Sequence, residues 1–214
     1  MPSFKEVKSI IEKLSSIEEL RGHICFFGGS IPYIFHGEES GREHSDVDIL
    51  VDSDYIGYVR AALKSSNMYN PKHDSLNLDL DMDYGLKAFL NGVYVEFEPM
   101  SYRDGVFTRA SFSPEKELAG IQVIPCEKIE DIIVPITVGG NRTLSQSMEM
   151  IMAEKEIYKK EEYRREKDEK DIQFIKEHGI DEAKYQRVQE AIKRSKTEIH
   201  TYDEIRSSKK GQSL

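Results

Sequence analysis

The chain has 214 residues, 38% of them hydrophobic, which suits one domain with an appendage or two small domains. No apolar run approaches the roughly 18 residues of a membrane span, and no signal-peptide pattern opens the chain, so we expect a cytoplasmic protein without a membrane partner. The net charge is −9, and the first 140 residues hold 23 of the 39 acidic but only 13 of the 30 basic side chains, which disfavours a long nucleic-acid duplex as a partner.

The N-terminal elements follow from capping and hydrophobic periodicity. Ser3 and Glu6 have the spacing of a capping box, and apolar residues then recur at helical intervals, which predicts an amphipathic helix. The next segment, His23–Phe27, is apolar enough to be a central strand. It leads into a turn, Gly28-Gly29-Ser30, and then into a short helix over Ile31–Phe35.

The second predicted strand covers 46–51 and places Asp46 and Asp48 on one face. Two adjacent carboxylates repel each other unless a cation lies between them, and Mg²⁺ (or Mn²⁺) prefers oxygen ligands of this kind. Gly28 and Gly29 let the backbone approach a ligand closely, and Ser30 begins a helix whose N–H groups favour a phosphate. The two segments together predict a phosphate-binding turn that faces a metal-binding pair.

Gly28-Gly29-Ser30 followed by Asp46-Val47-Asp48 resembles the signature of the nucleotidyltransferase superfamily, whose catalytic fold is similar to that of DNA polymerase beta. The connecting Gly41-Arg42-Glu43-His44-Ser45 resembles the Arg…Ser-Asp-x-Asp approach of small bacterial and archaeal members. The resemblance implies transfer of a nucleoside monophosphate from an NTP to a hydroxyl-bearing acceptor, with Asp46 and Asp48 holding two metal ions. It also implies that Gly29 and Ser30 bind the β- and γ-phosphates.

Arg42 has two interpretations. Its planar guanidinium could make paired hydrogen bonds to the nucleotide phosphates. Alternatively, it is a surface residue that pairs with Glu38, Glu39 or Glu43.

The middle of the chain contains several weaker signals. The run Leu76–Asp83 alternates strictly, which predicts an edge strand or loop with one solvent-exposed face. It is not predicted to be a calcium loop, because it lacks the required glycine and terminal glutamate. Four further elements are predicted from apolar spacing and turn residues: a helix over Asp54–Lys64, strands over Val106–Phe112 and Ile121–Ile124, and a short helix over Glu127–Val134. Gly139-Gly140 marks a break between two halves.

Asn91-Gly92 lies between two alternating segments and predicts a β-hairpin over 86–98. The nucleotidyltransferase resemblance implies a third metal carboxylate on a strand beside the Asp-x-Asp strand. Glu96, between Val95 and Phe97, is our first candidate and Glu98 the reserve. The alternative is that both glutamates simply face solvent.

From Ser145 onward the chain is highly charged, with helical spacing of its apolar residues. Lys155 and the later Lys167-Asp168-Glu169-Lys170-Asp171 resemble a pattern of the AbiEii-like toxin group. That resemblance implies that Lys155 helps to hold the triphosphate and that Asp168 or Asp171 serves the site. The alternative is a solvated helix with Glu–Lys pairs four residues apart.

These signals predict an α+β fold, a nucleotidyltransferase-like mixed β-sheet flanked by helices, with a helical C-terminal half. We expect a catalytic domain over 1–140, a helical region over 141–200 and a mobile tail over 201–214. The predicted activity is two-metal transfer of an NMP to a small molecule, a tRNA end or a protein. Two alternatives stay open: a toxin that acts on tRNA and has an antitoxin partner, and a non-catalytic nucleotide-binding or interaction module.

Overall fold

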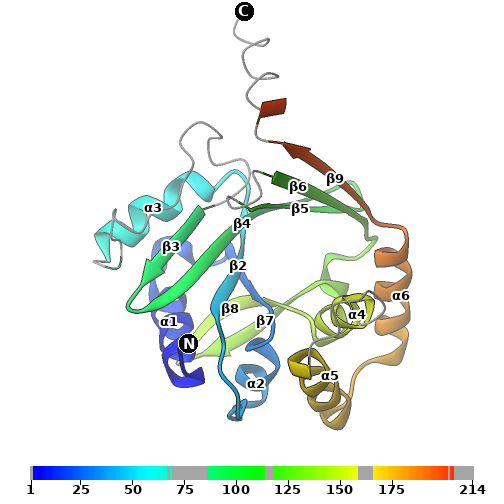
Figure 1. The fold of residues 1–214 in the computed structure, drawn as a ribbon, viewed down its shortest axis with the longest axis horizontal. Helices are drawn as coiled ribbons and strands as arrows, with labels where there is room; N and C mark the ends of the chain where they lie inside the picture. The colour runs from blue at the N-terminus through cyan, green and yellow to red at the C-terminus, as the bar shows by residue number, and fades with distance from the viewer. Residues whose placement is uncertain are drawn as a thin grey trace, which may run out of the picture.

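The computed structural model (Figure 1) describes residues 2–66, 68, 86–113, 118–158, 166–201 and 203–204. Its helices are α1 (Phe4–Ser16), α2 (Ile31–His36), α3 (Ile56–Ser65), α4 (Met148–Tyr158), α5 (Glu166–His178) and α6 (Glu182–Lys193), with short 3₁₀ turns at Glu18–Leu20 and Ile129–Asp131. Its strands are β1 (Ile24–Phe27), β2 (Asp46–Asp52), β3 (Leu86–Leu90), β4 (Val93–Arg103), β5 (Val106–Ser113), β6 (Leu118–Pro125), β7 (Ile133–Val138), β8 (Asn141–Gln146) and β9 (Lys196–Thr201).

All of these strands join one mixed sheet in the order β7-β8-β1-β2-β4-β5-β6-β9, and β3 pairs with β4. The α+β class predicted from the sequence is confirmed. Helices α4, α5 and α6 lie together at the right of Figure 1, and α1 and α3 lie at the left. Among the described residues, none of the helices combines the length and the apolar character that crossing a bilayer requires.

The first helix forms as its sequence predicts. The Ser3 hydroxyl accepts a hydrogen bond from the Glu6 backbone N–H, and the Glu6 carboxylate accepts one from the Ser3 backbone N–H at 2.8 Å. This capping box satisfies N–H groups that a helix start leaves unpaired. The apolar side of α1, including Ile11 and Leu14, is fully buried in the core.

The central strands bring the predicted acidic residues together. β1 lies between β8 and β2, and β2 pairs in parallel with β4, so that Asp48 is opposite Glu96 and Leu50 is opposite Glu98. The hairpin that carries β4 is confirmed, because Asn91 and Gly92 both have positive φ angles, 48° and 90°. Since residues two apart on a strand share a face, the two aspartates and two glutamates lie on one side of the sheet.

The C-terminal half holds the predicted helices, α4, α5 and α6, and adds two strands. Asn141–Gln146 is the strand β8, which pairs with both β1 and β7, and Lys196–Thr201 is the strand β9 at one end of the sheet. Gly139 and Gly140 form the β7–β8 turn with φ angles of 55° and 81°, rather than a break between halves. Pro135 is compatible with β7 because that strand is at an edge of the sheet.

Two predicted segments fall mostly or wholly outside the described residues. The alternating run 76–83 lies entirely outside them. Of the predicted tail over 201–214, only 201, 203 and 204 are described, and Thr201 is the last residue of β9.

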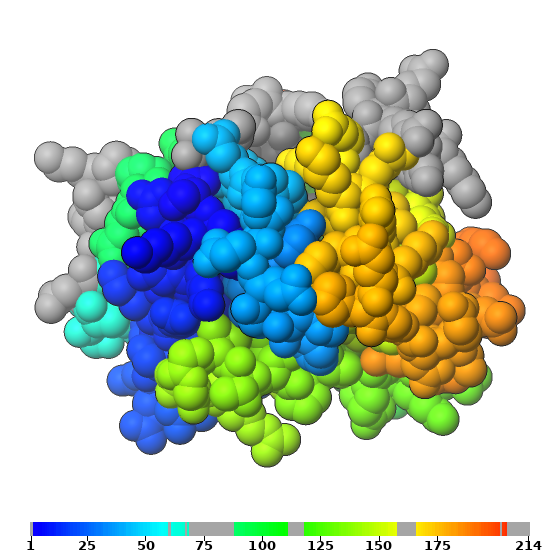
Figure 2. Space-filling view, turned by 90° about the horizontal axis from the view of Figure 1, so that it is seen from below, coloured from blue at the N-terminus to red at the C-terminus, as the bar shows by residue number. Residues whose placement is uncertain are grey.

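Helix α2 lies directly beside α5, as Figure 2 shows, where the blue surface of α2 meets the gold surface of α5. On this contact the His178 Nε2–H donates a hydrogen bond to Glu38 Oε1 at 2.7 Å, and the ring packs against the His36 ring. The segment that follows the glycine turn is therefore held against the C-terminal helices.

Candidate active site

A cavity of about 260 Å³ lies where the end of β1, the start of β2 and helix α4 meet. Eight of the eleven residues predicted for the site line it: Gly28, Gly29, Ser30, Arg42, Asp46, Asp48, Lys155 and Asp168. Glu96, Glu98 and Asp171 do not line it.

In the glycine turn, Gly28-Gly29-Ser30, the two glycines pack so closely against neighbouring groups that neither position admits a side chain. Gly28 has a φ angle of 87°, and a Cβ placed there would lie 2.6 Å from Asp48 Oδ2. A Cβ on Gly29 would collide with the guanidinium of Arg42 and the carboxylate of Asp171. The turn therefore places the backbone of Gly28 directly against Asp48 and that of Gly29 against Arg42 and Asp171.

Within the carboxylate pair, Asp48 is in an electrostatically unfavourable environment. Burial, followed by the negative charges of Asp46, Glu98 and Glu96, raises the pKa of Asp48 well above its usual value. Ser45 donates a hydrogen bond to Asp46 Oδ1 at 2.8 Å. The oxygen-only donor set suits Mg²⁺ or Mn²⁺.

A complete metal site is not assembled by protein groups alone. Within the described ranges, no three His, Cys, Asp or Glu side chains are placed so that they could hold one ion. Mg²⁺ commonly binds through one or two carboxylates and takes its other ligands from water and substrate phosphates, so Asp46 and Asp48 still fit such an ion. Both Glu96 and Glu98 affect Asp48 electrostatically, and the choice between them stays a prediction.

Arg42 forms a paired contact with a buried acid instead of lying on the surface. Its side chain is 14% exposed, and Nε and Nη2 donate to the two carboxylate oxygens of Asp171 at 3.1 and 2.8 Å. Nη2 also donates to the Gly29 carbonyl at 3.2 Å. Arg42 thus connects the glycine turn to α5.

Lys155 is part of the same buried network. Its ammonium lies 2.7 Å from Asp168 Oδ1 and 2.9 Å from Asp171 Oδ2. Tyr33 donates a further hydrogen bond to Asp171 at 3.0 Å. Asp168 and Asp171 are only 4% and 0% exposed, so these two positions do not belong to a solvated helix face. Asp171 instead positions Arg42 and Lys155 at the cavity.

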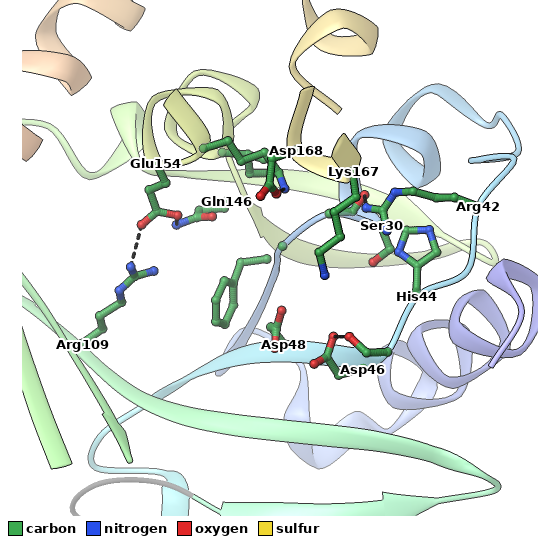
Figure 3. A pocket seen from close by; sticks show the side chains of 16 residues that line it. Ser30, Arg42, His44, Asp46, Asp48, Arg109, Gln146, Glu154, Lys167 and Asp168 are labelled. Carbon is green, nitrogen blue, oxygen red and sulfur yellow. Dashed lines mark hydrogen bonds and ion pairs between the residues drawn. The ribbon is translucent and has the colours of Figure 1, made fainter. Parts of the chain in front are cut away.

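The structure adds cavity residues that the sequence did not indicate. Arg109 from β5, Gln146 from β8 and Glu154 from α4 form one wall, seen at the left of Figure 3. Lys167 projects into the cavity from the opposite side. Arg109, Gln146 and Glu154 belong to no recognisable motif, because the sheet and α4 bring them together from separate parts of the chain, whereas Lys167 lies in α5, in the Lys167–Asp171 pattern noted in the sequence.

His44 also lines the cavity, but as a buried neutral ring. Burial, followed by the positive charge of Arg42, lowers the pKa of His44 to about 4. Its ring packs against Phe4, and its Nε2 lies 2.8 Å from the Ser40 hydroxyl. A base of such low pKa is poorly matched to proton abstraction at neutral pH.

The fold is that of nucleotidyltransferases. No protein-family model matches the sequence, and no curated protein matches it either. Among solved structures, the antibiotic-resistance factor ANT(2″)-Ia in solution is similar with a TM-score of 0.56 at 17% identity, over 90% of this chain and 93% of that one. The lincomycin-bound lincosamide antibiotic adenylyltransferase LnuA is similar with a TM-score of 0.52 at 20% identity, over 80% and 95% of the two chains. A nucleotidyltransferase-like protein of Paracoccidioides brasiliensis gives 0.50 at 18% identity, over 89% and 87%.

The buried network predicts a large stability loss for Asp171→Asn. The substitution keeps the shape but leaves the charges of Arg42 and Lys155 without their shared counter-charge, and breaking a buried pair in this way costs about 3 kcal/mol or more. Urea unfolding monitored by circular dichroism measures this loss. The matched control is Glu166→Gln, which removes an exposed pair with Lys170 on the same helix and should change nothing measurable. Equal stability of the two variants would contradict the network.

The unfavourable environment of Asp48 predicts the opposite effect for Asp48→Asn. Because the pKa of Asp48 is raised in the folded state, the native protein binds more protons than the unfolded chain at pH values above 3.8. Its free energy of unfolding therefore falls as the pH rises from 3.8 through the folded-state pKa. In EDTA at pH 7.5 the variant should therefore melt no lower than wild type, and its advantage should shrink towards pH 4.5. Asp52→Asn, on the same strand but outside the cavity, is the control. A much lower melting temperature for Asp48→Asn would show that Asp48 is a structural residue.

Proposed function

We propose that the protein transfers a nucleoside monophosphate from an NTP to a hydroxyl group of a small-molecule acceptor and releases pyrophosphate. The observation that carries this proposal is the meeting of three features in one cavity: the glycine turn, the Asp46–Asp48 pair, and the basic side chains of Arg42, Lys155 and Lys167. The shared nucleotidyltransferase fold supports it.

In this proposal the chain's own residues position the two reactants. The backbone of Gly29 and Ser30 binds the β- and γ-phosphates, because the turn admits close approach and carries no side chain beyond Ser30. Lys155 and Lys167 offset the phosphate charge, while Arg42 holds the turn in place. Lys155 already has carboxylate partners, so it contributes as one member of the buried network rather than as an isolated charge.

Asp46 and Asp48 would hold Mg²⁺ or Mn²⁺, which neutralises the charge that develops on the phosphate oxygens when bound. Glu96, or Glu98 in its place, would act from β4 as the third carboxylate by accepting the proton of the attacking hydroxyl. Both glutamates share the sheet face of the aspartates. Much of the rate enhancement would then come from positioning two reactants in one cavity.

A small-molecule acceptor is favoured over the other predicted classes. LnuA is described with lincomycin bound, and a second ANT(2″)-Ia structure, with a TM-score of 0.53 at 16% identity, is described in complex with adenylyl-2″-tobramycin. The similarity covers most of those chains, which argues that the same cavity serves a similar purpose here. A tRNA-end or protein acceptor, an antitoxin partner and the AbiEii-like resemblance stay predictions.

The test is a transfer assay with each of the four α-³²P-labelled NTPs, Mg²⁺, and three acceptor classes: hydroxyl-bearing small molecules including tobramycin and lincomycin, bulk tRNA, and protein. We expect label on a small molecule. Asp48→Asn should lower the rate by about three orders of magnitude or more, because charge neutralisation in the transition state is lost. Asp52→Asn should stay within about two-fold of wild type. Transfer that is insensitive to Asp48→Asn, or no transfer to any class, would refute the assignment.

A further inference from the structure

One wall of the cavity has no role in the proposed phosphate or metal binding. Gln146 at the end of β8, Glu154 on α4 and Arg109 on β5 line the cavity on the side away from Lys167 and Ser30 (Figure 3). On α4, Glu154 and Lys155 are consecutive, yet the first belongs to this wall and the second to the buried network of the phosphate side.

The wall is a connected polar group held by strong contacts. Arg109 lies 2.7 Å from Glu154 Oε1, and both side chains are less than 15% exposed. Gln146 Nε2 donates to Glu154 Oε2 at 3.1 Å. Arg109 Nε donates to Gln122 outside the cavity at 2.8 Å, which fixes the guanidinium. The wall is therefore rigid and close to charge-neutral.

Gln146 has an acceptor atom that nothing described in the chain satisfies. The residue is 0% exposed, and among the described residues no donor reaches its Oε1. The amide orientation is set by Glu154, whose carboxylate only accepts hydrogen bonds and so requires the amide nitrogen beside it. Buried polar atoms are nearly always paired, and a ligand donor would recover the free energy that this unpaired oxygen costs.

We propose that Gln146 and Glu154 form a hydroxyl-binding subsite, with Arg109 as the positioning residue. Both groups present acceptor oxygens, so the ligand must offer hydrogen-bond donors. Arg109 offsets the charge of Glu154, so a neutral hydroxyl is favoured over an ammonium group. The inference rests on the proposed function, and the hydroxyls have two possible sources: the ribose of the NTP or the acceptor molecule.

Isothermal titration calorimetry on Gln146→Leu separates the two sources. The probes are each NTP with Mg²⁺, its 2′,3′-dideoxy analogue, tobramycin and lincomycin. If the ribose binds here, the variant loses about five- to ten-fold in NTP affinity, the usual effect of one buried hydrogen bond, and the dideoxy analogue is unaffected. If the acceptor binds here, both nucleotides bind as in wild type and the hydroxyl-rich probe weakens by a similar factor.

The matched control is Gln189→Leu, because Gln189 is a half-buried glutamine that donates to Glu156 on the other side of α4, outside the cavity. It should leave every affinity within about two-fold of wild type. The subsite would be overturned by unchanged affinities for Gln146→Leu or by equal losses of affinity in both variants. It would also be overturned if the wild-type protein bound the NTP and its dideoxy analogue equally well and bound neither tobramycin nor lincomycin. Failure of the proposed function is distinguishable: it abolishes label transfer, whereas failure of the subsite leaves transfer intact and insensitive to Gln146→Leu.

Discussion

The buried carboxylate of Asp171 is the contact on which the arrangement of the cavity depends. It accepts hydrogen bonds from Tyr33 and Arg42 and pairs with Lys155. Tyr33 and Arg42 come from the N-terminal half and Lys155 from α4, so one side chain of α5 joins both halves around the glycine turn. Because Arg42 also donates to the Gly29 carbonyl, the position of the turn depends on Asp171, which lies 129 positions after Arg42 in the chain.

The charges around the cavity fall into three groups with different physical consequences. The network around Asp171 is compensated, so it stabilises the fold and orients basic side chains. At Asp48, burial and then the negative charges of Asp46, Glu98 and Glu96 raise the pKa, and the positive charge of Arg109 offsets only part of this effect. In the wall, the opposite charges of Arg109 and Glu154 offset each other, but among the described residues Oε1 of Gln146 has no hydrogen-bond donor. The first group therefore links the elements around the cavity, and the other two are the groups to which we assign the proposed ligands.

The local parts of this structure could be predicted from the sequence. Short-range rules predict three features: the capping box of α1, the Asn91-Gly92 hairpin, and the placement of Asp46 and Asp48 on one face of β2. The β7–β8 hairpin was missed because a short apolar run with a proline does not distinguish a strand from a helix end. The wall was missed because Arg109, Gln146 and Glu154 meet only through sheet pairing and helix packing. The pattern indicated Lys155, Asp168 and Asp171 by resemblance, but only the packing shows that the two acids are buried against the lysine.

In the proposed reaction, Asp46 and Asp48 bind divalent cations, which in turn bind the NTP phosphates on the glycine turn. A crystal structure with a non-hydrolysable NTP and Mn²⁺, whose anomalous signal locates the ions, tests it most directly. We expect Mn²⁺ between the carboxylates of Asp46 and Asp48 and the phosphates, with the β- and γ-phosphates against Gly29 and Ser30. A triphosphate bound elsewhere, or Mn²⁺ held away from both aspartates, would contradict it.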